Sequence, residues 1–269
     1  SNLGDLMLTK EDIRTASDVL WNLWNGCQRI DMLPNLYRPK TRTDGYSIQA
    51  LLEQRSAAPL FGWKIAATSS AGQSHIGVDG PLAGRLISER AHDDGAYISL
   101  GDTLMRVAEP EFSFRMAYNL PPREQPYDMK EVVDAVESLH PAIEIPDSRY
   151  ENFTTAGEAQ LIADNACAHE FVLGPPAPVS WREIPLDLHL VQIEVFLGRS
   201  VKGIGRNVLG DPRIALTWLV NELSGLGVCV EEGQIVTTGT AATPSPICPG
   251  DKVCADFGCL GSVTANFVL

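Results

Sequence analysis

Hydrophobic and polar positions along the first 56 residues repeat with the spacing of helices. Residues 9–12 have the form of a capping box, with Asp in place of the usual Glu. The apolar positions that follow give one amphipathic face, and they are Ile13, Ala16, Leu20, Leu23 and Trp24. A second helix is predicted from Thr43 to about Gln54. The pattern therefore predicts a helical N-terminal segment over residues 1–56.

From Leu60 onward the pattern changes to short alternating stretches separated by Gly, Pro and Asp, which is typical of strands and turns. We predict strands at 60–66, 234–238, 252–257 and 262–268, and a hairpin over 186–201 that turns near Gly198. We predict helices at 129–138, at 159–168, and from Asp211-Pro212 to Gly225 or Gly227. Residues 57–269 are thus predicted to form a β-rich body, and the fold class is α+β.

Three glutamates in two of the predicted strands are candidates for a shared site. Residues i and i+2 of a strand point to the same face, so Glu109 and Glu111 project together. Glu144 lies between two isoleucines that favour the core, so it projects from the opposite face of its strand. Three carboxylates that converge among apolar residues cannot all stay ionised without a cation. Oxygen ligands suit Mg²⁺, Mn²⁺ or Ca²⁺. Spacing alone leaves open a metal site or three solvated strand carboxylates.

Lys64 and Asp79 are two further candidates, each with a plain alternative. Lys64 lies between Trp63 and Ile65 in a predicted apolar strand, where a lysine either pairs with a carboxylate or extends to the surface. Asp79 precedes Gly80-Pro81, and the local sequence favours a simple turn residue.

Two other segments could line a pocket. Residues 203–212 are rich in glycine and lead into a helix N-terminus, which can offer amides to an anion, although they lack the P-loop and dinucleotide patterns. Residues 237–240 follow an apolar strand and are either pocket-lining hydroxyls or a plain strand end. No Gly-x-Ser-x-Gly elbow is present, so the sequence gives no support for nucleophilic catalysis.

Composition narrows the partners and the compartment. The 269 residues are 44% hydrophobic and 20% charged, which is ordinary for a globular protein, and the formal net charge is −13. That charge argues against nucleic acid or an anionic membrane as the main partner. No apolar run approaches a membrane span, and no basic segment followed by an apolar one opens the chain, so we expect neither anchor nor signal peptide. Six cysteines without a C-x-x-C pair indicate reduced thiols and a cytoplasmic location.

Nine short motifs, taken in their order along the chain, match one enzyme family. They are Asp44 to Gln49, Gly62-Trp63-Lys64, Gly77-Val78-Asp79, Glu109-Pro110-Glu111, Glu144 to Arg149, Ala163 to Ala166, Asn207 to Gly210, Thr238-Gly239-Thr240, and Ala255 to Gly258 with Leu260-Gly261-Ser262. Together they resemble the 2-oxopent-4-enoate hydratase family of the fumarylacetoacetate hydrolase superfamily, from about Thr43 to the C-terminus.

The resemblance implies a β-rich body with a helical N-terminal segment, a bound Mg²⁺ or Mn²⁺, and a short 2-oxo or 2-hydroxydienoic acid as substrate. It also implies roles for single residues: Glu109, Glu111 and Glu144 match metal ligands, Lys64 and Asp79 match catalytic polar residues, and Gln49 and Thr240 match positions near the substrate.

The sequence departs from the family pattern at several positions. Ala66-Ala67 stand where Gly-Leu is common, Arg206 replaces a small residue, and Asp211 replaces a usual His. We include Arg206 among the substrate-binding residues. If these positions line the pocket, the substrate differs from the simplest pentadienoate.

The activity we expect is hydration of a 2-hydroxydienoate to a 4-hydroxy-2-oxo acid in the catabolism of aromatic compounds. The metal would stabilise the enolate as a Lewis acid, and Lys64 would act on that enolate with Asp79 tuning its pKa. We also expect a homo-oligomer that acts on a small anionic 2-oxo acid, with no nucleic acid or membrane as partner.

Three alternatives stay open. A 2-oxo-3-enedioate decarboxylase would need a cation for the second carboxylate, from Arg206 or Arg149, whereas Trp63 beside Lys64 would suit an uncharged tail. A C–C hydrolase would need a His–Glu pair, for which His92 with Glu89 is the candidate. The last alternative is a metal-binding but inactive partner subunit.

Overall fold

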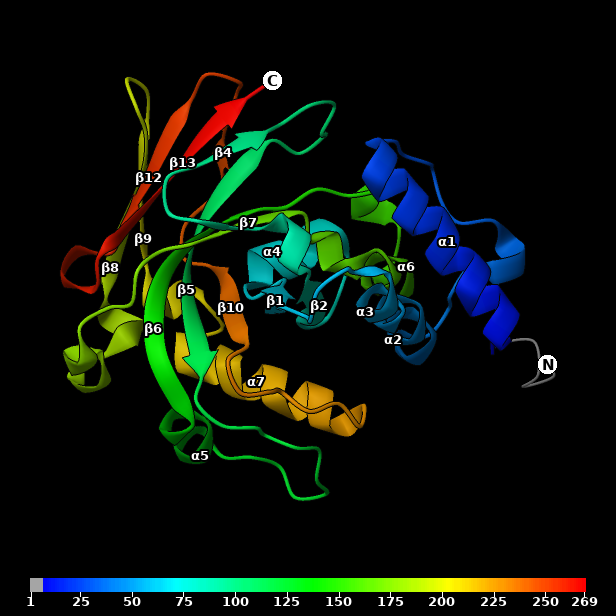
Figure 1. Cartoon of the computed structure of the whole chain (residues 1–269), viewed down its shortest axis with the longest axis horizontal. Coiled ribbons are helices and arrows are strands. Elements are labelled where there is room, and N and C mark those ends of the chain that lie inside the picture. Colours follow the sequence, from blue (N-terminus) through cyan, green and yellow to red (C-terminus); the bar gives the residue numbers. More distant parts are fainter. Residues whose placement is uncertain (1–6) are drawn as a thin grey trace.

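Two β-sheets make up the body of the protein in the computed structural model, which describes residues 7–269 (Figure 1). The larger sheet runs in the order β2 (Leu82–Leu86), β1 (Gly62–Ala66), β10 (Ile235–Thr240), β5 (Val107–Met116), β6 (Val136–Ile145), β7 (Glu170–Leu173) and β3 (Ala91–Asp93), and β11 (Ser245–Pro246) pairs with β5. The smaller sheet runs β4 (Ala96–Ser99), β13 (Ser262–Val268), β12 (Lys252–Asp256), β8 (Leu190–Val195) and β9 (Ser200–Ile204).

The core lies between the two sheets. Strands β12 and β13 alternate buried and exposed positions, and their buried side chains face β6 and β7. Phe112 of β5 and Phe257 of the smaller-sheet region meet edge to face, with ring centroids 4.9 Å apart. The long strands β5 and β6 are buried along most of their length, which fixes their register because a one-residue slip would turn every core side chain outward.

Among residues 7–269, seven α-helices surround the larger sheet. They are α1 (Lys10–Gly26), α2 (Arg42–Ala50), α3 (Leu52–Arg55), α4 (Ser70–Ile76), α5 (Met129–Asp134), α6 (Glu158–Ala163) and α7 (Pro212–Gly225). In Figure 1 the N-terminal helices lie at one end of the long axis of the molecule and the smaller sheet lies at the other. Among the described residues, no helix has the length and apolar character needed to cross a membrane.

The N-terminal helices form where the sequence predicted them. The capping box at the start of α1 is present, and Asp211 caps α7 with Pro212 in its first turn. Leu20 of α1 packs in one apolar cluster with Tyr150 and Ala163 of the body. The predicted boundary near residue 56 stays a prediction, since these contacts cross it.

Two predicted helices were too long, and one helix was not predicted. The helix predicted at 129–138 ends at Asp134, because the following valine-rich stretch enters β6, and β-branched residues favour strands. The helix predicted at 159–168 ends at Ala163, because the backbone then turns left-handed. Helix α4 was not predicted. The other predicted strands match. The hairpin is present with its turn near Gly198, but it begins at Leu190, because residues 186–188 form a 3₁₀ turn. The α+β class is confirmed.

Candidate active site

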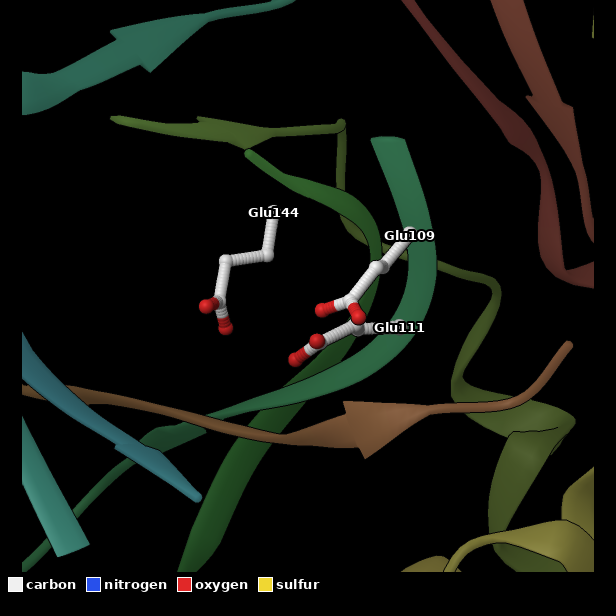
Figure 2. Close-up of side chains that lie close together, drawn as sticks. All are labelled: Glu109, Glu111 and Glu144. Carbon is white, nitrogen blue, oxygen red and sulfur yellow. The ribbon is translucent and has the colours of Figure 1, made fainter. Parts of the chain in front are cut away.

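Glu109, Glu111 and Glu144 come together at the centre of the larger sheet. Glu109 and Glu111 lie two residues apart on β5, and Glu109 is directly opposite Glu144 of β6 in the antiparallel register. Each can offer one carboxylate oxygen such that all three oxygens lie within 4.8 Å of one another. Figure 2 shows the carboxyl groups pointing into one space. The two-residue strand period therefore places the three groups together as the sequence predicted.

The three carboxylates differ in what binds them. Glu111 Oε1 accepts hydrogen bonds from the Thr237 hydroxyl at 2.7 Å and from the Gly239 amide at 3.1 Å, both on the neighbouring strand β10. Neither oxygen of Glu144 has a hydrogen-bond donor, although the residue is only 1% exposed. Lys64 Nζ lies 3.0 Å from Glu144 Oε1 as an ion pair, without hydrogen-bond geometry. A buried carboxylate with unused lone pairs is costly, so this arrangement suits a bound cation.

Proton affinities at the cluster follow from burial and like charge. Burial, together with the charge of Glu144, raises the pKa of Glu109 to about 8. Burial and the charges of Glu144 and Glu109 raise the pKa of Glu111 well above its usual value. A divalent cation would reverse both shifts, because it favours the ionised form of each ligand. The donor set, all oxygen, fits Mg²⁺ or Mn²⁺.

Lys64 is buried on β1 and points at the carboxylates. Its Nζ donates a hydrogen bond of 2.5 Å to the carbonyl of Ala166 and pairs with Glu144. Burial alone would lower the pKa of Lys64, but the charges of Glu144, Cys167 and Glu109 leave it raised, so the side chain is an ammonium. Of the two alternatives for Lys64, the structure shows the paired one.

A cavity of about 1240 Å³ opens beside the cluster. Of the predicted site residues, four line it: Lys64, Glu109, Thr240 and Arg206. Asn207 and Cys167, which sequence reasoning did not single out, also line it. The family motif that contains Asn207 was the available signal for that residue. Trp63 does not line the cavity, because it faces the other side of β1, where its Nε1 donates to Gln234. The prediction that Trp63 contributes to an apolar tail pocket is therefore wrong, whereas the other apolar residues near Lys64, which are Ile65, Ala66 and Ala67, do line the cavity.

Two other predicted residues lie away from the cluster. Asp79 is exposed in the turn before β2 and does not line the cavity, so the expected pairing with Lys64 is replaced by the pairing with Glu144. Gln49 is buried. Its Nε2 donates hydrogen bonds to the carbonyls of Ala83 and Ile162, and its Oε1 accepts one from the guanidinium of Arg85. Gln49 therefore packs behind the site in this structure, and direct roles for Gln49 and Asp79 in binding or catalysis stay predictions.

Arg149 has a structural position. Its backbone amide and its guanidinium bind the carboxylate of Asp164, and both residues are buried. Its other guanidinium nitrogens donate to the carbonyls of Asp164 and Ala168. Arg149 is thus fully engaged, and it is not free to bind the second carboxylate of a substrate.

The predicted His92–Glu89 pair is not formed. Glu89 instead accepts hydrogen bonds from Ser56 and from the Ala57 amide. His92 pairs with Glu170 at 2.6 Å. Glu170 lies opposite Ile145 on β6, so by strand alternation it faces away from Glu144. The cavity lining includes neither residue of the His92–Glu170 pair.

Comparison with known proteins gives the same assignment for the fold and the family. No family model matches the chain. The 2-keto-4-pentenoate hydratase 1 of Dechloromonas aromatica is 33% identical over 210 residues, 77% of this chain and 78% of that one. The 2-keto-4-pentenoate hydratase of Paraburkholderia xenovorans is 30% identical over 265 residues, 97% and 96% of the two chains. The structure of 4-oxalocrotonate decarboxylase from Pseudomonas putida G7, complexed with magnesium and adipate, has a TM-score of 0.88 at 27% identity, and covers 97% of this chain and 99% of that one.

The fold is the mixed α+β fold of the fumarylacetoacetate hydrolase superfamily, with a half-barrel sheet and N-terminal helices. Within that superfamily, the chain belongs to the family of the 2-keto-4-pentenoate hydratases and 4-oxalocrotonate decarboxylases. It is therefore an enzyme of this hydratase and decarboxylase family.

Proposed function

We propose that the protein is a metal-dependent hydratase that converts a 2-hydroxydienoate to a 4-hydroxy-2-oxo acid in aromatic catabolism. The observation that carries the proposal is the buried carboxylate of Glu144, which has no hydrogen-bond donor and lies beside Glu109 and Lys64, two residues that line the cavity. Hydratases such as those of Dechloromonas aromatica and Paraburkholderia xenovorans match the chain at 33% and 30% identity, whereas 4-oxalocrotonate decarboxylase of Pseudomonas sp. matches at 27%, and this difference supports hydration over decarboxylation.

Glu109, Glu111 and Glu144 would hold Mg²⁺ or Mn²⁺, which supplies Lewis-acid polarisation of a 2-oxo group when bound. The chain's own residues do the rest. The Lys64 ammonium lies beside the carboxylates, where it can stabilise a negative oxygen on C2 or return a proton. Thr240 and Arg206 line the cavity and would contact the substrate, and Asp79 is proposed to assist Lys64.

The proton balance of the reaction is simple. The 2-hydroxyl loses a proton while C5 gains one, which gives the 2-oxo-3-enoate. The hydroxide of a water molecule then adds to C4, and the proton of that water goes to C3. The product contains one water more than the substrate, and no oxidant or reductant is needed.

Decarboxylation of a 2-oxo-3-enedioate is the second candidate, and Arg206 is the residue that favours it. Arg206 lines the cavity with an exposed side chain, so it could bind a second carboxylate. The decarboxylase structure similar to this one was obtained with a dicarboxylate, adipate. Trp63 lies outside the cavity, but Ile65, Ala66 and Ala67 line it near Lys64 and would suit the uncharged tail of a monoacid.

The test offers a 2-hydroxydienoic monoacid and the matching enedioate to the Mg²⁺-loaded protein, with mass analysis of the products. Hydratase action adds the mass of one water to the monoacid, and the chelated protein serves as the control. If only the diacid reacts and CO₂ is released, the hydratase proposal is wrong. A homo-oligomer stays a prediction that sedimentation of the same sample would check.

A further inference from the structure

The carbonyl that holds Lys64 belongs to an unusual turn. Asn165, Ala166 and Cys167 have φ values of 59°, 52° and 61°, and no other part of residues 7–269 has three successive non-glycine residues with positive φ. Such a conformation is unfavourable for L-residues other than Asn and Asp, and it persists only where surrounding contacts enforce it. A right-handed continuation of α6 would direct these carbonyls along the helix axis. The left-handed turn directs the carbonyl of Ala166 to Lys64.

The contacts that enforce the turn come from both sides. From the β6 side, the Asp147 amide donates to the carbonyl of Cys167 at 3.1 Å, and Arg149 donates to the carbonyls of Asp164 and Ala168. From the β2 side, the contact is made by one side chain. The Asn165 amide accepts from the Arg85 N–H at 2.6 Å and donates to the Arg85 carbonyl at 2.7 Å.

The turn, β2 and Lys64 are packed without spare room. Gly84 is the partner of Lys64 in the β1–β2 register. A Cβ at Gly84 would lie 2.5 Å from the Asn165 carbonyl oxygen and 2.9 Å from Lys64 Cδ. The position of the turn relative to β2 therefore decides where the long, flexible Lys64 side chain can lie.

We propose that Asn165 is a positioning residue for Lys64. Asn165 accepts a hydrogen bond from the backbone amide of Arg85 and donates one to its carbonyl, and these two bonds fix the turn against β2. This turn fixes the Ala166 carbonyl, which holds Lys64 Nζ beside Glu144. The effect on catalysis rests on the proposed function, in which Lys64 acts on the substrate. The effect of Asn165 on the position of Lys64 does not depend on that function.

The chain offers a matched control for a test. Asn221 of α7 brackets the backbone of Tyr127 in the same way, accepting at 2.8 Å and donating at 3.0 Å, and it does not line the cavity. The two variants are Asn165→Gly, which suits a left-handed backbone, and Asn221→Ala, which suits a helix. Each removes two hydrogen bonds, so both should lower the Tm.

Only Asn165→Gly should affect turnover, since misplacing a reacting group by a fraction of an ångström is costly. We expect kcat to fall about tenfold or more while KM and the affinity for Mn²⁺ stay within roughly threefold, and Asn221→Ala to keep both constants within that range. If Asn165→Gly lowers the Tm and leaves kcat unchanged, Asn165 is merely structural and the proposal is overturned.

A second readout follows Lys64 without turnover. Acetylation by acetic anhydride, read by peptide mass spectrometry, compares buried Lys64 with exposed Lys130 in the same sample. The Lys64 to Lys130 ratio should rise about fivefold in Asn165→Gly and stay constant in Asn221→Ala. An unchanged ratio in Asn165→Gly overturns the proposal, and this readout decides even if the wild-type protein neither hydrates nor decarboxylates.

Should Asn165→Gly not fold, Gly84→Ala carries the test by displacing the turn from the other side. It should lower kcat about tenfold with KM within roughly threefold. Unchanged kcat in a folded Gly84→Ala protein counts against the proposal.

Discussion

Two groups of buried charged residues lie close together along the chain, and they differ in how completely their polar atoms are used. Asp164 accepts hydrogen bonds from the Ser148 hydroxyl and from the amide and guanidinium of Arg149. Glu144, five residues before Arg149, has no hydrogen-bond donor at either oxygen. Both carboxylates face a buried cation, so charge pairing alone does not separate them.

The difference shows how a structural ion pair and a functional one can be told apart. A buried pair whose remaining lone pairs are filled by donors stabilises one conformation and leaves nothing for a ligand. A buried carboxylate whose lone pairs lack donors lowers the stability of the protein, but it can bind a cation or a ligand. In this molecule the first kind fixes the turn after α6, and the second kind lies beside Lys64 and Glu109, which line the cavity.

The largest effect that this comparison predicts is on activity. Glu144→Gln removes the charge that a divalent cation needs, so activity should fall about a thousandfold or more, and Mn²⁺ binding by calorimetry should weaken strongly. The metal-free variant should also be less stable than the metal-free wild type, because the buried Lys64 ammonium loses the charge of its ion-pair partner. Full activity after exhaustive chelation of the wild-type protein would contradict the role of the metal.

Glu170→Gln is the matched control for that variant. Glu170 is one strand away from Glu144, faces the other side of the sheet, and is held by Arg90 and His92. The variant should lose stability and keep kcat and KM within roughly threefold. A loss of activity equal to that of Glu144→Gln would show that the two sides of the sheet are not separate.

The next effect is measured on stability. Asp164→Asn leaves the Arg149 guanidinium buried without a countercharge, which costs about 3–5 kcal/mol when one partner of a buried pair is removed. Urea unfolding should show a free energy of unfolding lower by that amount. A change below about 1 kcal/mol would mean that the pair resembles an exposed one.

The response of the metal-free protein to pH follows from Glu109. Its pKa is about 8 in the folded protein and near 4.5 when unfolded. The folded state therefore binds the proton more tightly, and this contribution to stability is full below pH 4.5 and is lost as the pH rises to about 8. The Tm of chelated protein should fall across that range, and added Mg²⁺ should restore it at pH 8. A Tm of chelated protein that rises steadily from pH 5 to pH 8 would refute the raised pKa.

The smallest effect concerns His169, which accepts a hydrogen bond from Trp24 of α1. Burial, together with the charges of Arg90 and Arg149, lowers the pKa of His169 to about 2. The unfolded chain takes up this proton near pH 6.5, so stability present above pH 6.5 is lost as the pH falls towards 2. His169→Gln should make the acid limb of a urea unfolding series shallower. An unchanged slope would assign the acid loss to other groups.

Sequence reasoning succeeded where a local period decides the geometry. The two-residue period of a strand was enough to group Glu109 with Glu111, and Glu144 followed from its isoleucine neighbours. The same period, applied to Trp63 beside Lys64, would have placed the indole on the opposite face, so the error over the apolar tail was avoidable.

Sequence reasoning failed where a distant segment decides. The carbonyl that accepts the hydrogen bond of Lys64 is 102 residues away in the sequence, and it belongs to a left-handed turn that contains no glycine to predict it. The extension of the helix beyond Ala163 was a reasonable inference from composition, because only the contacts of Arg149 and Asn165 force the left-handed turn. Glu89 was paired with His92 on proximity in sequence, whereas the sheet brings Glu170 to His92.

Strand β10 has a consequence for the order of events during synthesis. It lies between β1, which carries Lys64, and β5, which carries Glu111, and its residues 235–240 are synthesised long after both of those strands. Until then Glu111 lacks the Thr237 hydroxyl and the Gly239 amide, contacts that span 126 and 128 residues. Pairing over such separations is slow. Until β10 has been synthesised and inserted, the nascent chain thus carries Glu111 and Lys64 as separate, incomplete parts of the site, and it can act on substrate only afterwards.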